Sequence, residues 1–144
     1  MAGAEVLYTP TVLALAASLA DWPWDEALPL HGAARSKSCG SALTLGLATD
    51  ATGRISAIGM TAQACAIGQA AAAIFANAAM GQAGAAIAAS EREIHAWLSG
   101  NAPRPAWPGL ELLEPARAYP ARHGAILLSW QAARELLPSS ELHR

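Results

Sequence analysis

Two alternating apolar segments joined by a short turn place the strongest constraint on the fold. Residues 43–47 read Leu-Thr-Leu-Gly-Leu, which is the two-residue period of a strand with one buried face. Residues 50–53, Asp-Ala-Thr-Gly, are typical of a turn, and the alternation resumes over residues 55–62. We therefore predict two antiparallel strands that form a β-hairpin.

The register of this hairpin brings the two cysteines of the chain together. Ser41 and Ala64 lie about equally far from the turn on opposite strands, so they should face each other at the open end of the hairpin. Cys39 and Cys65 stand beside these two positions. The pattern alone therefore predicts that the two thiols share one site.

Cys65 also stands where the second strand runs into an alanine-rich helix. The unpaired N–H groups at a helix start and the positive end of the helix dipole stabilise a thiolate, the form that binds metals and attacks sulfur. Lys37, two residues before Cys39, would favour a thiolate there as well. The alternative is that both thiols pack in the core as small hydrophobic residues.

Composition limits the class of protein. A chain of 144 residues suits one domain with one core, and 53% hydrophobic against 14% charged residues predicts a globular protein. The formal net charge of −2 argues against nucleic acid as a main partner. The first residues lack the basic and apolar regions of a signal peptide, so we expect the cytoplasm, where free cysteines more often serve metal or redox chemistry than disulfides.

Residues 55–90 contain no charged side chain and are long enough to span a bilayer. Interspersed glutamine and asparagine, together with Gly81 and Gly84, instead indicate the end of a strand followed by two helices, so we expect no membrane span. The small residues 70–73 would let a neighbouring backbone approach closely. That neighbour is either part of the same domain or a second subunit of a homodimer.

Local signals set the remaining elements. Thr9 and Pro10 are the N-cap and first-turn proline of a first helix, and Pro120 opens the last one. Ser90 begins a capping box, Ser-Glu-Arg-Glu, that predicts another helix start. We predict helices near residues 10–20 and 66–80, after residue 90, and over residues 120–137. Between them we expect a loop over residues 21–38 with a short strand at 34–38, and a short apolar turn that Pro115 ends. The tail, residues 139–144, should be frayed. The predicted fold class is α+β, a small antiparallel sheet with helices packed on one face.

Four segments, in this order, resemble motifs of one known family. They are residues 7–10 (Leu-Tyr-Thr-Pro), 38–41 (Ser-Cys-Gly-Ser), 64–70 (Ala-Cys-Ala-Ile-Gly-Gln-Ala) and 119–130, which ends in Leu-Ser-Trp. They are similar to segments of the iron–sulfur cluster assembly scaffolds, the group of NifU N-terminal domains, IscU and SufU. The likeness covers nearly the whole chain. It implies one IscU/NifU-like domain over residues 1–144 that helps to build or transfer iron–sulfur clusters and is not an enzyme.

The chain departs from this family at three ligand positions. The register of the last segment puts Ala125 where the family has its third cysteine. Ser41 stands in place of the cluster-site aspartate, and Gly124 in place of the histidine of the IscU branch. Of the family's ligand set only the two cysteines remain.

The resemblance implies that Cys39 and Cys65 bind iron or an iron–sulfur cluster, with a cysteine desulfurase or other assembly proteins as partners. Tetrahedral iron takes four ligands, so two thiolates leave a shortfall. The remaining ligands would come from His123, His31, a second protomer, a small thiol or a partner protein. Zinc, which prefers the same tetrahedral ligands, is an alternative metal. A second hypothesis is a metal-free member that binds the desulfurase or a complete scaffold.

Arg122 and His123, which precede the third-cysteine position, are two further candidates. Arg122 matches a basic residue of the family and would hold a persulfide or an anionic cluster; the alternative is a solvated arginine at a helix start. His123 lies about 200° from Ala125 around a helix, so it reaches the site only if that turn is irregular. The alternative for His123 is a surface histidine.

Overall fold

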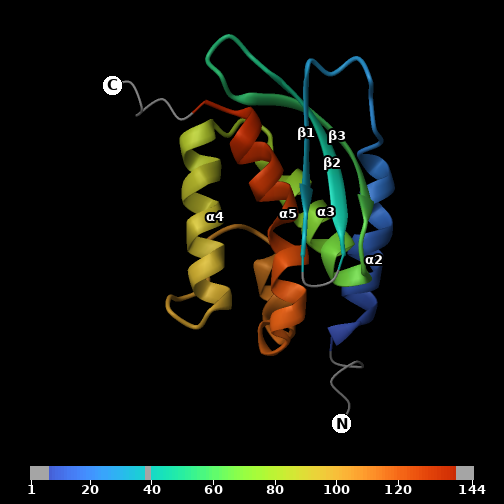
Figure 1. The fold of residues 1–144 in the computed structure, drawn as a ribbon, viewed down its shortest axis with the longest axis vertical. Helices are drawn as coiled ribbons and strands as arrows, with labels where there is room; N and C mark the ends of the chain where they lie inside the picture. The colour runs from blue at the N-terminus through green and yellow to red at the C-terminus, as the bar shows by residue number, and fades with distance from the viewer. Residues whose placement is uncertain (1–6, 38–39, 139–144) are drawn as a thin grey trace.

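The computed structural model describes residues 7–37 and 40–138, and its α+β architecture confirms the predicted fold class. Antiparallel strands form one sheet in the order β1-β2-β3, and helices pack against one of its faces (Figure 1). The strands are β1 (Leu30–Arg35), β2 (Ala42–Thr49) and β3 (Ile55–Gln63). The α-helices are α2 (Pro10–Ser18), α3 (Ala66–Ala79), α4 (Gly84–Leu98) and α5 (Pro120–Leu136), with 3-10 helices η1 (Leu19–Asp21) and η2 (Leu110–Ala118).

The predicted hairpin is confirmed with its register. Leu43 pairs with Ala62 and Ala42 with Gln63, so the chain positions of Ser41 and Ala64 come together at the open end. At the closed end the Asp50 carboxylate accepts hydrogen bonds from the Thr52 hydroxyl and from the backbone N–H groups of Thr52 and Arg54. These bonds, that of the Thr52 hydroxyl first, hold the pKa of Asp50 below its ordinary value.

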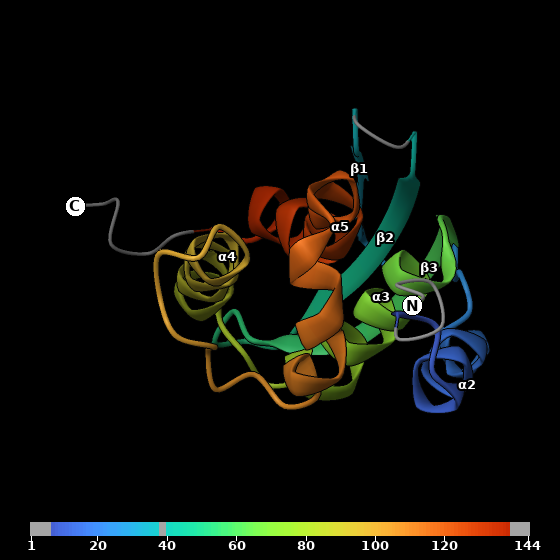
Figure 2. The same cartoon turned by 90° about the horizontal axis from the view of Figure 1, so that it is seen from below.

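The small residues of α3 pack inside the domain. Ala70, Ala71, Ala72 and Ala73 are each at most 1% exposed, so they do not form a surface for a second subunit. They lie in a helix that contacts α2, α5 and β3 at once, and Figure 2 shows α3 between α5 and α2. Small side chains are needed there because each neighbour must approach the α3 backbone closely.

An aromatic cluster completes the core. Phe75 stacks on Trp107 with ring centroids 5.8 Å apart, and Trp130 meets both rings edge-on at 5.2 Å. The Trp107 indole N–H donates to the Ile74 carbonyl at 2.9 Å, which satisfies the polar atom of a buried ring. This cluster joins α3, α5 and the loop before η2.

Three element predictions need correction. The first strand is Leu30–Arg35 and not residues 34–38, because the chain reverses directly after Arg35, where the Ser36 N–H donates to the Ser41 carbonyl at 2.8 Å. α4 begins at Gly84, before the predicted start at Ser90, because residues 85–89, four alanines and Ile87, continue the helix toward its N-terminus. η2 continues beyond Pro115 to Ala118.

The start of α2 agrees with the prediction, since the Val12 N–H donates to the Thr9 hydroxyl at 3.1 Å. No helix among the described residues combines the length and the apolar character that crossing a bilayer requires. The tail 139–144, predicted to fray, lies outside the described residues.

Residues 22–28, here called the strap, cross the other face of the sheet. The strap passes over Gly46 and Gly59, which are paired neighbours on β2 and β3. A Cβ atom at Gly59 would collide with the Pro23 carbonyl oxygen, and one at Gly46 would meet the Leu28 side chain at 3.1 Å. The Met60 N–H also donates to the Trp22 carbonyl at 2.9 Å, so the strap is held to the sheet by its backbone.

We predict that Gly59→Ala lowers the free energy of unfolding by about 2–3 kcal/mol, because the added methyl group meets rigid backbone. Gly46→Ala is the matched control, because Gly46 is the residue on β2 that pairs with Gly59. Its methyl group meets only side chains that can move, so its cost should stay below about 1 kcal/mol. Denaturant unfolding of both variants measures the difference, and equal losses would contradict the close passage of the strap over Gly59.

Candidate functional site

Three segments that carry candidate residues meet at one end of the molecule. The β1–β2 loop and the end of β3 are adjacent because Ala42 pairs with Gln63. The start of α3 follows β3 directly, and α5 packs against it: a Cβ atom at Gly68 would lie 3.2 Å from the Ala125 Cβ. Ala125, which the motif likeness matches to the family's third cysteine, is therefore next to the first turn of α3.

Cys65 is the N-cap residue of α3 and is half-buried as a free thiol. Its side chain makes no capping bond to the helix. Its carbonyl accepts the first helical bond, from the Gln69 N–H at 3.0 Å, and the Gln69 side-chain amide donates to the Ala64 carbonyl at 3.2 Å. These bonds fix the backbone on both sides of the thiol. Cys39, the other predicted thiol, lies outside the described residues.

The two residues that the motif likeness matches to family ligands, Ala125 and Ser41, are both buried. Ala125 is 1% exposed and faces α3, and Ser41 is 4% exposed at the end of the β1–β2 loop. Neither an alanine methyl group nor a neutral hydroxyl replaces a thiolate or a carboxylate as a metal ligand. In the part of the chain that the structure describes, no three His, Cys, Asp or Glu side chains come close enough to hold a metal ion.

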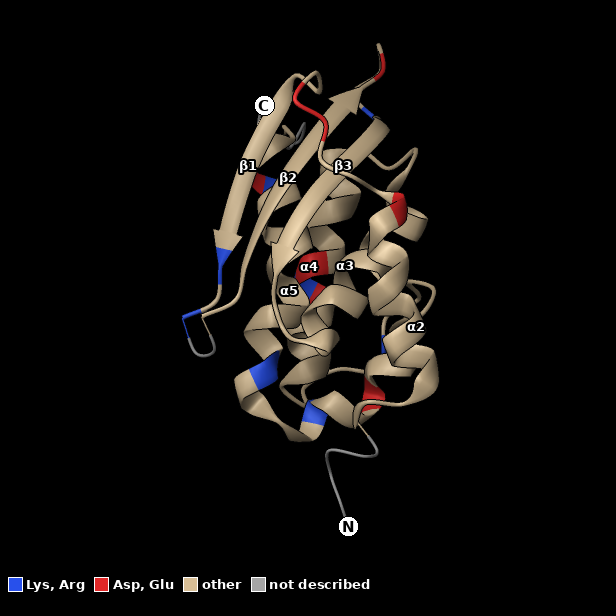
Figure 3. Cartoon of the chain, turned by 90° about the vertical axis from the view of Figure 1, so that its right-hand side faces the viewer, with Lys and Arg blue, Asp and Glu red and all other residues tan. Residues whose placement is uncertain are grey.

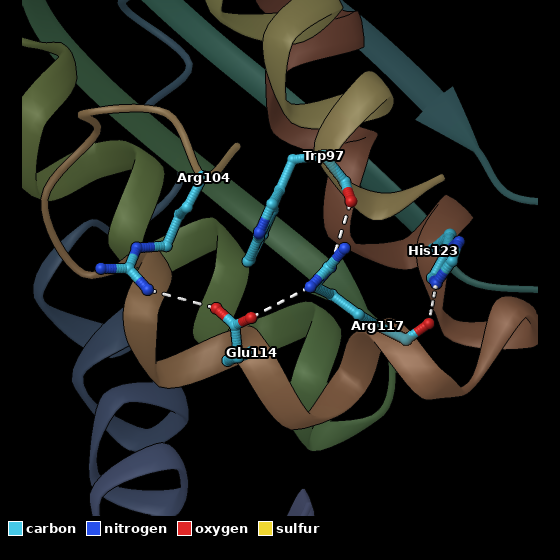
Figure 4. A network of polar contacts seen from close by, with 5 residues as sticks. All are labelled: Trp97, Arg104, Glu114, Arg117 and His123. Atoms are coloured by element: carbon cyan, nitrogen blue, oxygen red, sulfur yellow. Dashed lines mark hydrogen bonds and ion pairs between the residues drawn. The ribbon is translucent and has the colours of Figure 1, made fainter. Parts of the chain in front are cut away.

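His123 is held by η2. Its Nε2 atom lies 2.9 Å from the Arg117 carbonyl oxygen, to which it donates a hydrogen bond (Figure 4). Arg117 is itself anchored, because its Nε donates to the Trp97 carbonyl at 3.0 Å and its guanidinium pairs with Glu114 at 3.0 Å. The half-buried His123 is therefore not a free surface histidine, and only its Nδ1 atom is left for another ligand.

The segments that form this end carry cations and no carboxylates. Residues 27–49 and 115–134 contain no Asp or Glu. Arg35 and Lys37 are exposed beside the loop, and Figure 3 shows blue at the end of β1 and in the turn that follows. Arg122 lies half-buried in the first turn of α5, where its N–H donates to the Tyr119 carbonyl at 2.8 Å. A surface of this charge attracts anions more than cations.

His31 is not brought to this end. It lies on the outer face of β1, where its ring contacts the Trp24 ring at a centroid distance of 4.8 Å. It pairs with Gly46, whereas the site end of the sheet begins at the Arg35–Ala42 pair. The strap contact could have been anticipated only by recognising that Gly46 and Gly59 leave room for a crossing segment.

No family model and no curated protein matches the chain. Solved structures do match it. A nitrogen-fixing NifU-like protein (N-terminal) from Brucella abortus is 24% identical, with 99% of this chain and 100% of that one covered and a TM-score of 0.85. A putative iron–sulfur cluster assembly scaffold protein for the SUF system from Fervidobacterium islandicum AW-1 is 19% identical, with 92% and 97% covered and a TM-score of 0.74. The chain therefore has the fold of NifU-like N-terminal and SufU proteins.

We predict that Gly68→Ala destabilises the fold by about 1 kcal/mol or more, although alanine is the better helix former. The reason is that the new Cβ would lie 2.8 Å from the Ala64 Cβ and 3.2 Å from that of Ala125. Combining it with Ala64→Gly removes the closer contact, so the loss should shrink in the double variant. A double-mutant cycle of unfolding free energies tests this, and additive losses would contradict the packing described.

Proposed function

We propose that this protein is a divergent iron–sulfur cluster assembly scaffold, related to NifU, IscU and SufU, that takes iron or a nascent cluster as cargo. The observation that carries the proposal is the position of Cys65: a free thiol at the N-cap of α3, one helical turn from the contact between Gly68 and Ala125. The fold shared with a SUF-system scaffold supports it. We place this activity in the cytoplasm and assign it no catalytic residues.

Cys39 and Cys65 would bind the cargo as thiolates. His123 would add Nδ1 as a third ligand, because its bond to the Arg117 carbonyl is the kind of outer contact that orients ligating imidazoles. Arg122 would balance the negative charge of a cluster or a persulfide. A remaining ligand would come from a small thiol, a second protomer or an assembly partner such as a cysteine desulfurase, since each tetrahedral iron takes four.

A second candidate function rests on a different observation. Among the described residues, which do not include Cys39, no three metal-binding side chains lie together, and Ala125 and Ser41 offer no thiolate or carboxylate. A chain with the scaffold fold and an incomplete ligand set would serve as a metal-free partner of the desulfurase or of a complete scaffold. A third possibility, between the cluster-binding scaffold and the metal-free partner, is a chain that binds zinc through the two thiolates and an imidazole.

We expect anaerobic reconstitution with ferrous iron and sulfide to load the wild-type chain, and Cys65→Ser to abolish loading. Metal and sulfide analysis with an absorption spectrum measures cargo, and sizing before and after loading shows whether a homodimer shares it. Ser129→Ala, a buried change elsewhere on α5, is the control for general damage. A wild-type chain that stays monomeric and holds neither iron nor zinc would favour the metal-free partner.

We predict that Ala125→Cys tightens iron or zinc binding by about tenfold or more, because it adds a thiolate beside the first turn of α3. Ala133→Cys is the matched control. It is equally buried on the same helix but about 12 Å farther along the axis, and it should not change the affinity. Competition with a chromogenic chelator measures both, and equal effects would refute the assignment of Ala125 to the site.

A further inference from the structure

An open groove lies between α2 and the β3 edge of the sheet. Figure 3 presents the side of the molecule on which α2 and β3 lie. It has a volume of about 460 Å³. Small residues of α2 form one wall, the strap residues Pro23 and Trp24 a second, and Met60 with Thr61 of β3 a third. The α2 wall includes Ala16 and Ala17, whose short side chains keep the groove wide. The lining is mostly apolar, which is typical of a surface that binds another molecule.

The β3 edge beside this groove offers unpaired backbone groups. The Met60 N–H bonds the strap at Trp22, so it points away from β2. Residues on one strand alternate in direction, so the N–H and carbonyl of Ala62 point to the same open edge. Among the described residues, the Ala62 N–H donates no hydrogen bond to a backbone group outside the sheet. An open edge of this kind can accept an added strand.

The rim of the groove is acidic and lacks cations. Residues 7–34 contain no Lys or Arg, whereas Asp21, Asp25 and Glu26 are all exposed. The Glu26 carboxylate accepts a hydrogen bond at 2.8 Å from the Trp24 indole, which is part of the groove wall. Figure 3 shows no charged residue in α2, and it shows red in the strap and in η1, which follows α2. The groove therefore pairs an apolar floor with a negative rim.

We propose that this groove binds an extended segment of a partner protein that carries lysine or arginine, added as a strand to β3 beyond Met60. Main-chain bonds to Ala62 give affinity that does not depend on sequence. Alternate side chains of the segment point into the groove, toward the alanines of α2, and must be small or apolar. The others point outward, where the rim carboxylates select cations. This surface is distinct from the thiol site and does not depend on the proposed cargo.

The test uses two synthetic eight-residue peptides, one alternating valine with lysine and one alternating valine with glutamate. We expect only the lysine peptide to bind, with an affinity that falls as salt is added. Calorimetry measures binding, and amide NMR should show the Ala62 N–H shifting as the lysine peptide is added. Asp21→Asn combined with Glu26→Gln should weaken the lysine peptide about fivefold.

Two leucine variants of α2 separate the groove from nonspecific attraction. Ala17→Leu fills the groove and should weaken the lysine peptide about tenfold or more. Ala14→Leu is the matched control, since Ala14 is exposed on α2 but does not line the groove. Equal binding of the two peptides, an unmoved Ala62 amide, or equal effects of the leucine variants would overturn the proposal. If the protein forms a dimer and Ala17→Leu abolishes it, the groove binds a second copy of this chain, and the proposal is overturned as well.

Discussion

Close packing around α3 is the constraint on which the rest of the structure depends. The helix contacts α2, α5 and β3, and its central alanines are fully enclosed. Each larger side chain at these positions would push one neighbour outward, because a packed interior has no room to absorb extra methylene groups. The aromatic cluster around Phe75 fills the space at the other end of the helix. Small residues near Cys65 and large ones farther along fix both the position and the direction of α3.

The same packing determines what the candidate site can hold. Gly68 lets Ala64 and Ala125 approach the first turn of α3, so the N-cap position of Cys65 depends on the absence of a side chain at residue 68. Ala125 serves this contact, and the sequence likeness described above would put the third cysteine of the scaffolds at this position. The Cβ atom of residue 125 makes this contact, and in this chain it carries no ligand atom. If the proposed cargo binds here, its further ligands therefore come from another side chain, such as His123 of α5, or from outside the chain.

Much of the fold could be predicted because several signals were local and strong. The hairpin followed from alternation around Asp50, and α2 followed from the Thr9 cap. The errors arose where distant contacts decide. The first strand was misplaced because Gly32 and its neighbours are too small to show alternation, although Gly32 packs under Leu136 of α5. The capping box at Ser90 was misleading because residues 85–89 are good helix formers and already belong to α4.

The candidate site was only partly accessible from sequence for the same reason. Spacing brought Ser41 and Ala64 together, since a hairpin register is a count of residues. The contact of Gly68 with Ala125 joins residues far apart in the chain, and no local pattern indicates it. The hydrogen bond from His123 to the Arg117 carbonyl depends on how η2 turns before α5, which no periodicity encodes.

The small net charge of −2 conceals a division of the surface. The first cation of the chain is Arg35, at the end of the sheet that carries the candidate thiol site, and the strap on the other side carries carboxylates. Gln69 links the two regions, since it lines the groove and its N–H bonds the Cys65 carbonyl. A segment bound in the groove would therefore contact the helical turn that presents Cys65. Opposite charges on the two surfaces would let an anionic cargo and a cationic partner segment bind side by side without competing for the same residues.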